Sequence, residues 1–194
     1  MAIRNIRKEG DEILKKKSRE VEVIDDKVRE LIEDMVETMH KYDGVGLAAV
    51  QVGILKQIIV IDIYDENTPI VKLINPKIIK TKGEREVDEG CLSYPNKFAK
   101  VKRPVEVTVE GLNEKGEKVK IKAVELLAQA LCHEIDHLNG ITFVDVMEPG
   151  TLEYINPKVN FGLTLNLPPS ARTIESLSGL ETFQFLTLDE KSSL

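Results

Sequence analysis

His133-Glu134-Ile135-Asp136-His137 is the stretch around which the rest of this chain is organised. On an α-helix, residues four apart lie on one face and about 6 Å apart along the axis. Two imidazoles placed in this way can bind one metal ion, and Glu134 then lies within reach of a water on that ion. Zinc-dependent hydrolases use this arrangement: the metal polarises a carbonyl and the carboxylate moves a proton.

A five-residue match also occurs by chance, and histidines four apart are common on exposed helices. The neighbouring residues are apolar on most sides of the predicted helix: Leu126, Leu127, Ala130, Leu131, Ile135 and Leu138. This pattern predicts a buried helix, and buried imidazoles and carboxylates need partners. A shared metal supplies one, so the sequence favours a metal site.

A metal site needs at least one more protein ligand. The chain has three histidines and two cysteines, so the choice is narrow. Phe143 stands where one large protease group has a third histidine, which excludes that group. Another protease group takes a glutamate from a following helix, but nearby prolines and a glycine argue against a helix at Glu148 and Glu153. His40 and Cys91 remain as candidates.

The composition indicates one soluble globular domain with a sizeable core, at 194 residues with 42% hydrophobic and 31% charged residues. The net charge of 27 − 33 = −6 disfavours a general nucleic-acid binder. The first residues lack the apolar core of a signal peptide, and no apolar run approaches membrane-spanning length. Two cysteines cannot form a disulfide framework, so a reducing cytoplasm is the expected location.

Hydrophobic periodicity predicts two helices and several strands. Residues 1–23 are expected to form an irregular arm with one helical turn. A long amphipathic helix begins near Asp25 and ends at His40, which we interpret as a cation at the helix C-terminus. Strands are expected at 58–63, 70–74, 77–81, 105–109 and 118–121. The helix with both motif histidines is expected from about 123 to 139.

Two further stretches carry polar residues in unusual surroundings. Gly44 and Gly46 indicate a backbone that another group approaches closely. Gln51 follows among apolar residues and is either a buried glutamine that satisfies the backbone or a site residue. Cys91, after a glycine, is expected on a turn or strand end. Alone it reads as a buried free cysteine, but beside a site that lacks a ligand it reads as that ligand.

Three motifs therefore stand together: Gly44-Val45-Gly46-Leu47-Ala48-Ala49-Val50-Gln51, Glu89-Gly90-Cys91-Leu92-Ser93 and His133-Glu134-Ile135-Asp136-His137-Leu138-Asn139-Gly140. In this order and at these separations they resemble the peptide deformylase family, whose members remove the formyl group from new polypeptides. The similarity runs from about residue 3 to residue 145. It implies an α+β fold, with antiparallel or mixed β-sheets surrounding a central helix that bears the HExxH motif.

The resemblance also implies a ligand set. Cys91, His133 and His137 would hold one divalent ion with water in the fourth position. The ion is expected to be Fe²⁺, while Zn²⁺, Ni²⁺ or Co²⁺ also accept nitrogen and sulfur donors. Glu134 would take a proton from the water and later deliver it to the departing amine.

Further roles follow from the match to the family motifs. The Gln51 side-chain amide and the backbone N–H of Leu92 would stabilise the oxyanion. The substrate backbone would lie as an added strand along three segments, which are Gly44-Val45-Gly46, Glu89 and Gly90. Glu89 is also expected to pair with Arg103 and so fix the loop that carries the cysteine.

The chain departs from the family pattern in three places. Cys132 replaces a glutamine of many relatives with a thiol open to oxidation, and Gln129 replaces an apolar residue near the substrate pocket. From about Asn156 no family pattern is found. We therefore expect a catalytic domain at 1–150 and an appendage at 151–194 without catalytic role. N-formylmethionyl nascent peptides are the expected partners in a bacterial cytoplasm, and the ribosome is a candidate partner. No membrane and no sequence-specific nucleic acid are expected.

Two alternatives remain open. The first is an HExxH metallopeptidase with a carboxylate as its third ligand. The second is a non-catalytic metal-binding protein of the same fold. Cys91→Ala would distinguish the first alternative, because a deformylase would lose its metal and such a metallopeptidase would keep it. Glu134→Gln would distinguish the second, because an enzyme would lose turnover with its metal still bound and a binding protein would be unaffected.

Overall fold

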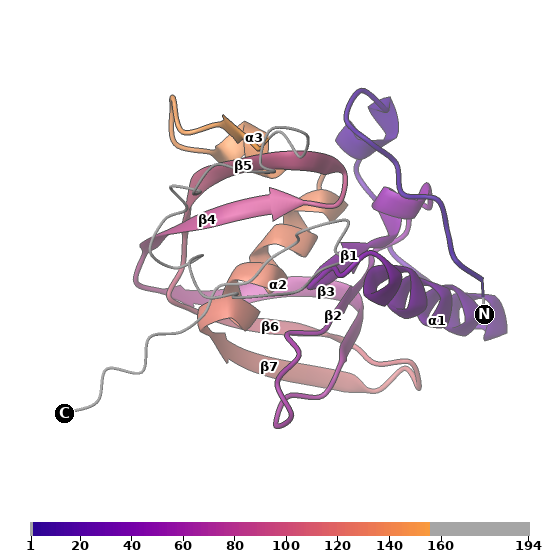
Figure 1. Ribbon diagram of the computed structural model, residues 1–194. Helices are drawn as coiled ribbons and strands as arrows, with labels where there is room; N and C mark the ends of the chain where they lie inside the picture. Colours follow the sequence, from indigo (N-terminus) through magenta and orange to yellow (C-terminus); the bar gives the residue numbers. More distant parts are fainter. Residues whose placement is uncertain (1, 156–194) are drawn as a thin grey trace.

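The computed structural model describes residues 2–155 of the chain, and these residues form two antiparallel sheets with two main helices (Figure 1). The first sheet has five strands in the order β1 (Gly46–Ala48), β2 (Ile58–Ile61), β3 (Val71–Lys82), β6 (Glu106–Leu112) and β7 (Lys118–Val124). The second has three strands in the order β4 (Arg85–Cys91), β5 (Tyr94–Arg103) and β8 (Glu153–Tyr154). All strand pairs in these two sheets are antiparallel. The α+β class with antiparallel sheets is therefore confirmed.

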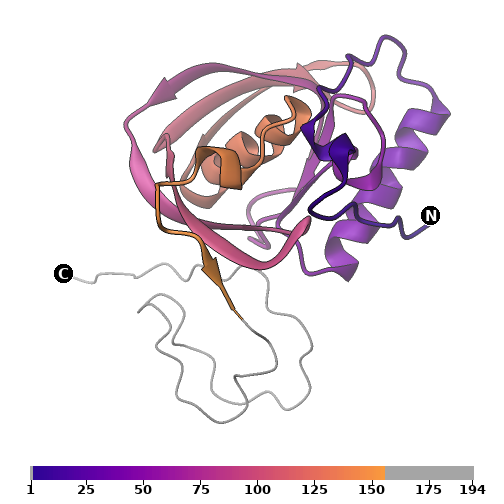
Figure 2. The ribbon, with the colours of Figure 1, turned by 90° about the horizontal axis from the view of Figure 1, so that it is seen from above.

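The helices are α1 (Asp26–Lys41), α2 (Glu125–Leu138) and the short α3 (Phe143–Val146), with 3₁₀ turns η1 (Glu12–Lys15) and η2 (Ala49–Val52). The side chain of Asp25 caps α1 by accepting a hydrogen bond from the backbone N–H of Val28 at 2.9 Å. The turn η1 is the single helical turn expected in the N-terminal arm. Helix α2 lies between the two sheets (Figures 1 and 2). Within residues 2–155, no helix combines the length and apolar character that a membrane crossing requires.

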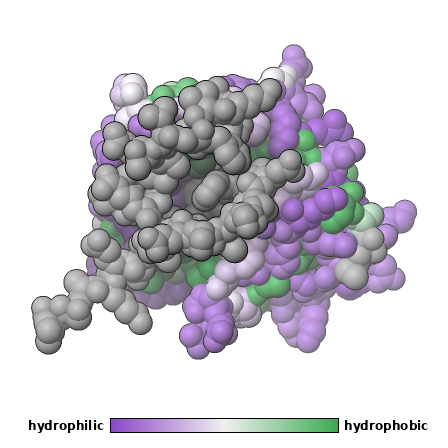
Figure 3. All heavy atoms as spheres, in the orientation of Figure 1, coloured by the Kyte–Doolittle hydropathy of each residue, from purple (hydrophilic) through white to green (hydrophobic). Residues whose placement is uncertain are grey.

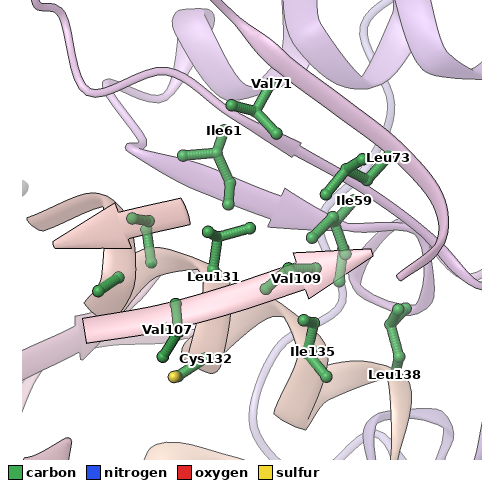
Figure 4. Close-up of a cluster of buried hydrophobic side chains, with 14 of the residues drawn as sticks. Ile59, Ile61, Val71, Leu73, Val107, Val109, Leu131, Cys132, Ile135 and Leu138 are labelled. Atoms are coloured by element: carbon green, nitrogen blue, oxygen red, sulfur yellow. The ribbon is translucent and has the colours of Figure 1, made fainter. Parts of the chain in front are cut away.

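Strand β2 explains how the two main helices are held on opposite faces of the large sheet. Its four residues are all buried, and their side chains alternate between the faces. Ile58 and Val60 join the apolar stripe of α1, whereas Ile59 and Ile61 join α2. Figure 4 shows the second cluster, in which Leu131, Ile135 and Leu138 of α2 face β2, β3 and β6. Each such side chain stabilises the fold by roughly 1.5–3 kcal/mol when it is fully buried.

Strand β3 contradicts the prediction of two separate strands at 70–74 and 77–81. One strand continues through Asn75-Pro76, and its register against β6 shifts between Ile74 and Lys77. Asn75 adopts a left-handed φ of 52°, and its side chain bonds to the backbone of Val21 on both sides, at 2.8 and 3.0 Å. Proline is tolerated in a strand at such a bulge because no ladder N–H is needed there. The Asn-Pro pair therefore bends the strand rather than ending it.

The hairpin of β4 and β5 was not predicted, although it supplies one wall of the site. Inward side chains of β5 alternate with exposed lysines: Ala99, Val101 and Arg103 point inward, and Lys100 and Lys102 are exposed. The coloured part of the face in Figure 3 is likewise mainly hydrophilic, with scattered apolar residues. The expected appendage falls, from residue 156 onward, outside the residues that the structure describes.

Candidate metal centre

Cys91, His133 and His137 come together as a buried cluster of metal-binding side chains. Their ligand atoms all lie within 4.8 Å of one another, and no other group of this kind occurs within residues 2–155. The two histidines are one helical turn apart on α2, with ring centroids 4.9 Å apart. The sulfur of Cys91 lies 3.2 Å from Nε2 of His137. One thiolate and two imidazoles form a donor set that suits Zn²⁺, Fe²⁺ and similar borderline ions.

Cys91 reaches α2 because it is the last residue of β4. The strand ends in a two-residue turn, Leu92-Ser93, after which Tyr94 begins β5 opposite Cys91. The register shifts between Gly90 and Cys91, and this irregularity moves the cysteine out of the regular ladder. The sequence-based expectation of a strand end or turn at Cys91 agrees with this geometry.

A row of charged side chains lies behind the cluster. Nδ1 of His133 lies 2.9 Å from Oε2 of Glu89. Arg103 donates to the same carboxylate through Nε at 2.7 Å and Nη2 at 3.0 Å, and its Nη1 donates to Asp136 at 2.6 Å. Burial disfavours the charge on Glu89, but the hydrogen bonds from His133 and Arg103 outweigh it and lower its pKa to about 2. The expected Glu89–Arg103 pair is therefore present, and Asp136 extends it.

These surroundings shift the pKa values of the two imidazoles in opposite directions. Burial disfavours a charged ring at His133, but hydrogen bonds with Cys91 and Glu89 prevail and raise its pKa well above the usual value. Burial lowers the pKa of His137, and the neighbouring charge of His133 lowers it further. Among the described residues, Nδ1 of His137 has no hydrogen-bond partner although it is buried.

Glu134 lies beside the cluster and carries an unsatisfied acceptor. It is 4% exposed, and its Oε2 has no hydrogen-bond partner among residues 2–155. Burial is the main reason that its pKa rises to about 7. A buried polar atom without a partner is costly, and such atoms often mark a missing water, ion or substrate. The cluster and this carboxylate together fit a site for a metal ion and a water.

Gln51 is fixed so that its amide nitrogen faces the cluster. Its Oε1 accepts a hydrogen bond from the backbone N–H of Ala48 at 2.8 Å. Its Nε2 lies 3.4 Å from Sγ of Cys91 and 3.2 Å from Oγ of Ser93. The question that the sequence left open has a mixed answer, because one end of this buried side chain serves the backbone and the other faces the site.

A pocket opens onto this arrangement and brings most of the expected site residues together. The residues that line it are Gly44, Val45, Gly46, Gln51, Glu89, Gly90, Cys91, Leu92, Leu126, Gln129, Ala130, His133 and Glu134. His137 lies outside this lining and is fully buried. Leu126 and Ala130 were predicted only as core residues of the helix, although they lie about two turns and one turn before His133. Their spacing along α2 was the available signal.

The structure gives a second physical reason for two of the glycines. A Cβ at Gly46 would lie 2.9 Å from Cδ of Glu134, and a Cβ at Gly90 would lie 2.7 Å from Cε1 of Phe98. Real Cβ atoms essentially never approach so closely, so a larger residue at either position would have to displace the Glu134 or the Phe98 side chain. Contacts within the protein therefore also favour glycine at these two positions, and the approach of a substrate stays a prediction. Gly44 lines the same pocket.

His40, the other candidate ligand, and the second cysteine, Cys132, lie apart from the cluster. Nε2 of His40 is 2.8 Å from Oδ2 of Asp62, at the end of α1. Cys132 packs in the apolar cluster between α2 and the large sheet (Figure 4). Burial raises the pKa of the Cys132 thiol to about 11. This argues against the expectation that its thiol is open to oxidation, because the thiolate is the reactive form.

Comparison with known proteins agrees with the family that the motifs indicate. Residues 3–153 match the family profile described as Polypeptide deformylase. The chain belongs to the polypeptide deformylase family. It is 55% identical over 148 residues to peptide deformylase 2 of Clostridium acetobutylicum, covering 76% of this chain and 97% of that protein. It is 57% identical over 145 residues to a peptide deformylase of Alkaliphilus metalliredigens, covering 75% of this chain and 97% of that protein.

Solved structures of polypeptide deformylases have the same fold. A peptide deformylase from Legionella pneumophila aligns with a TM-score of 0.74 at 43% identity, covering 76% of this chain and 88% of that one. A peptide deformylase from Synechococcus elongatus, in complex with actinonin, aligns with a TM-score of 0.73 at 45% identity, covering 75% of this chain and 81% of that one. These alignments cover about three quarters of the present chain.

Proposed function

We propose that this chain is a metal-dependent peptide deformylase that hydrolyses the N-formyl group from the formylmethionine of newly made polypeptides and releases formate. Family membership supports the reaction class. The single structural observation that carries the proposal is the position of Glu134. One buried oxygen of its carboxylate has no hydrogen-bond partner among the residues that the structure describes, and the side chain lines the same pocket as Cys91 and His133.

Cys91, His133 and His137 are proposed to hold the metal ion, with Fe²⁺ as the resident ion and Zn²⁺, Ni²⁺ or Co²⁺ as substitutes. When bound, a divalent ion polarises the formyl carbonyl and makes water easier to deprotonate. The Glu89 carboxylate orients the His133 ring through Nδ1, which leaves the other ring nitrogen for the ion. Arg103 holds Glu89 in turn, so α2 and the β4–β5 hairpin are connected through the site.

Glu134 is proposed as the general base and acid. It takes the proton of the attacking water and returns it to the departing amine, which balances the hydrolysis of the amide. In the metal-free protein, burial raises the pKa of this carboxyl to about 7, toward the range in which a carboxyl can both accept and donate a proton near neutral pH. Its burial also keeps competing solvent from the reacting atoms.

Gln51 and Leu92 are proposed to stabilise the oxyanion. The amide nitrogen of Gln51 already faces Cys91, and its carbonyl end is held by the backbone, so little reorganisation is needed. The backbone N–H of Leu92 is the second proposed donor. Removing one such donor typically costs about 2.7–4 kcal/mol of transition-state stabilisation.

The substrate peptide is proposed to lie as an extended strand along the pocket wall. The Gly44-Val45-Gly46 segment and Glu89-Gly90 both line the pocket. β1 and β4 are edge strands of their sheets, so their outer backbones are available for added pairing. The methionine side chain would enter the apolar part of the pocket near Leu126 and Ala130.

The catalytic unit is proposed to be residues 1–150, organised around the HExxH-bearing helix with the long N-terminal helix as its support. Residues 151–194 are proposed to form an appendage without catalytic role. The bacterial cytoplasm is the proposed location and the ribosome a candidate partner. We propose that the protein binds neither a membrane nor a specific nucleic-acid sequence.

An anaerobic assay with formyl-Met-Ala-Ser, with metal analysis of the same sample, tests the function. Release of formate and free amine by the metal-loaded protein is expected. No release from a fully loaded sample would contradict the proposal. The Glu134→Gln variant should keep its metal and lose turnover, whereas a non-catalytic metal protein has no turnover to lose. Cys91→Ala should lose the metal, whereas a metallopeptidase with a carboxylate ligand would retain it.

A further inference from the structure

The N-terminal arm crosses both segments that carry the proposed oxyanion donors. The backbone N–H of Arg7 donates to the backbone carbonyl of Gln51 at 2.7 Å. Two residues later, the backbone N–H of Glu9 donates to the backbone carbonyl of Ser93 at 2.8 Å. These two bonds place the intervening residue, Lys8, directly beside the turn that follows Cys91.

The side chain of Lys8 forms a hydrogen bond with this turn. Its Nζ lies 2.6 Å from the backbone carbonyl oxygen of Leu92. That carbonyl belongs to the same peptide unit as the N–H of Ser93. The Ser93 N–H in turn lies 3.4 Å from Sγ of Cys91. A continuous path therefore runs from the ammonium, through one peptide unit, to the sulfur.

Hydrogen bonds arranged in series strengthen one another, because each polarises the next. A charged donor on a peptide oxygen makes the N–H of that unit a stronger donor. The sulfur of Cys91 carries negative charge when it is deprotonated to act as a ligand. The Lys8 ammonium therefore supports the charged sulfur without touching it.

We propose that Lys8 is a positioning residue for the metal centre, which holds and polarises the Leu92–Ser93 peptide so that its N–H bonds to the Cys91 sulfur. The same bond fixes the backbone of Leu92, whose own N–H is a proposed oxyanion donor. The inference rests on the proposed function for its kinetic consequence. Its structural consequence concerns the protein alone.

The electrostatic surroundings of Lys8 agree with this role. Burial lowers the pKa of Lys8, and the negative charge of Cys91 acts in the opposite direction. Other contacts anchor the arm already. Arg4 pairs with Asp34 at 2.8 Å, and Lys97 bonds to both carboxylate oxygens of Glu9 at 2.7 and 2.8 Å.

Three variants test the proposal. Lys8→Met removes the ammonium and keeps a side chain of similar length, and Lys8→Arg keeps the charge. Lys97→Met is the matched control, because it removes a lysine that holds the neighbouring arm residue and does not line the pocket. The first readout is the amide ¹H and ¹⁵N resonance of Ser93 in metal-free protein. The second is kcat and KM of the metal-loaded protein on a formylmethionyl peptide.

Lys8→Met is expected to move the Ser93 resonance toward that of a weaker donor, while Lys97→Met leaves it in place. Lys8→Met should also lower kcat, by at most about fivefold, with KM within about twofold, since serial polarisation changes one hydrogen bond by only about 10–30%. Lys8→Arg should restore both. The proposal is overturned if the Ser93 resonance is unchanged in Lys8→Met, moves equally in Lys97→Met, or is not restored by arginine. An inactive wild-type protein would contradict the proposed function, and the resonance would still decide the role of Lys8.

Discussion

Arg103 donates two hydrogen bonds to Glu89, from Nε to Oε1 at 2.7 Å and from Nη2 to Oε2 at 3.0 Å. Glu89 is 1% exposed and Arg103 is 6% exposed, so both charges of this pair are buried. Oε2 of Glu89 also contacts His133, which makes the pair part of the support of the metal centre. Removal of one member leaves the other as an uncompensated buried charge.

Arg103→Met is expected to destabilise the protein by about 3–5 kcal/mol, because the Glu89 carboxylate stays buried without its cation. The orientation of His133 should loosen with it, and metal affinity should fall about 10- to 100-fold. Urea unfolding and competition with a chelator measure the two effects. Lys102→Met is the matched control, since its ion pair with Glu148 is exposed and should contribute less than about 1 kcal/mol. Equal behaviour of the two variants would show that the buried pair is unimportant.

Gly46→Ala is expected to lower kcat about 100-fold, because the new Cβ would displace the Glu134 carboxylate, and misplacing a catalytic group by about 1 Å costs that much. The metal content should stay near that of the wild type, since the ligands Cys91, His133 and His137 are not displaced. Gly150→Ala is the control, because nothing lies within 4 Å of a Cβ there and only its left-handed φ of 80° is strained. A Gly46→Ala enzyme with full kcat would place the reacting carboxylate elsewhere.

Local patterns in the sequence predicted those parts of the fold in which one segment decides its own structure. The stripe of α1 and the helical spacing of the two histidines in α2 repeat within a few residues, so they can be read directly. The β4–β5 hairpin escaped prediction because only one face is buried and many of its residues are charged. The Asn75-Pro76 pair was misread because its bulge is stabilised by a contact with Val21, which is 54 residues distant.

Some residues of the candidate site could likewise be predicted from local spacing, whereas others could not. His133, Glu134 and His137 follow from spacing on one helix, and Cys91 followed only as the ligand that the two-histidine site still lacked. The contacts of Asp136 with Arg103 and of Lys8 with Leu92 join residues 33 and 84 positions apart. No local pattern predicts such pairs, because Lys8, Arg103 and Asp136 are ordinary charged residues in their own segments. They arise only when the sheets and the arm come together.

Glu134→Gln is expected to stabilise the metal-free protein at neutral and alkaline pH. The folded pKa of Glu134 is about 7, above the usual 4.5, so the folded state holds this proton more tightly. Stability from this group is thus fully present below pH 4.5 and is lost as the pH rises toward 7. Above pH 7 the variant should exceed the wild type by about 3 kcal/mol, at about 1.4 kcal/mol per pKa unit.

Urea unfolding of chelator-treated protein between pH 4.5 and 8 measures this difference, and comparing the two proteins cancels the titration of groups that both retain. The gap should widen as the pH rises. Glu84→Gln removes an exposed carboxylate and should change stability by less than about 0.5 kcal/mol throughout. A gap of constant size across the range would mean that Glu134 does not change its charge on this side of neutrality.

The two cysteines are expected to differ sharply toward iodoacetamide in metal-free protein at pH 8. Cys132 is 4% exposed in the apolar core, and its pKa of about 11 leaves about one thiolate in a thousand molecules at that pH. Cys91 is 8% exposed and lines the pocket, so we expect the reagent to reach it from there. Mass spectrometry should find the label at Cys91, and added Zn²⁺ or Co²⁺ should protect it because the sulfur is then a ligand. Cys132→Ser should label like the wild type and Cys91→Ser hardly at all, whereas labelling of Cys91 at the same rate with and without metal would remove the sulfur from the ligand set.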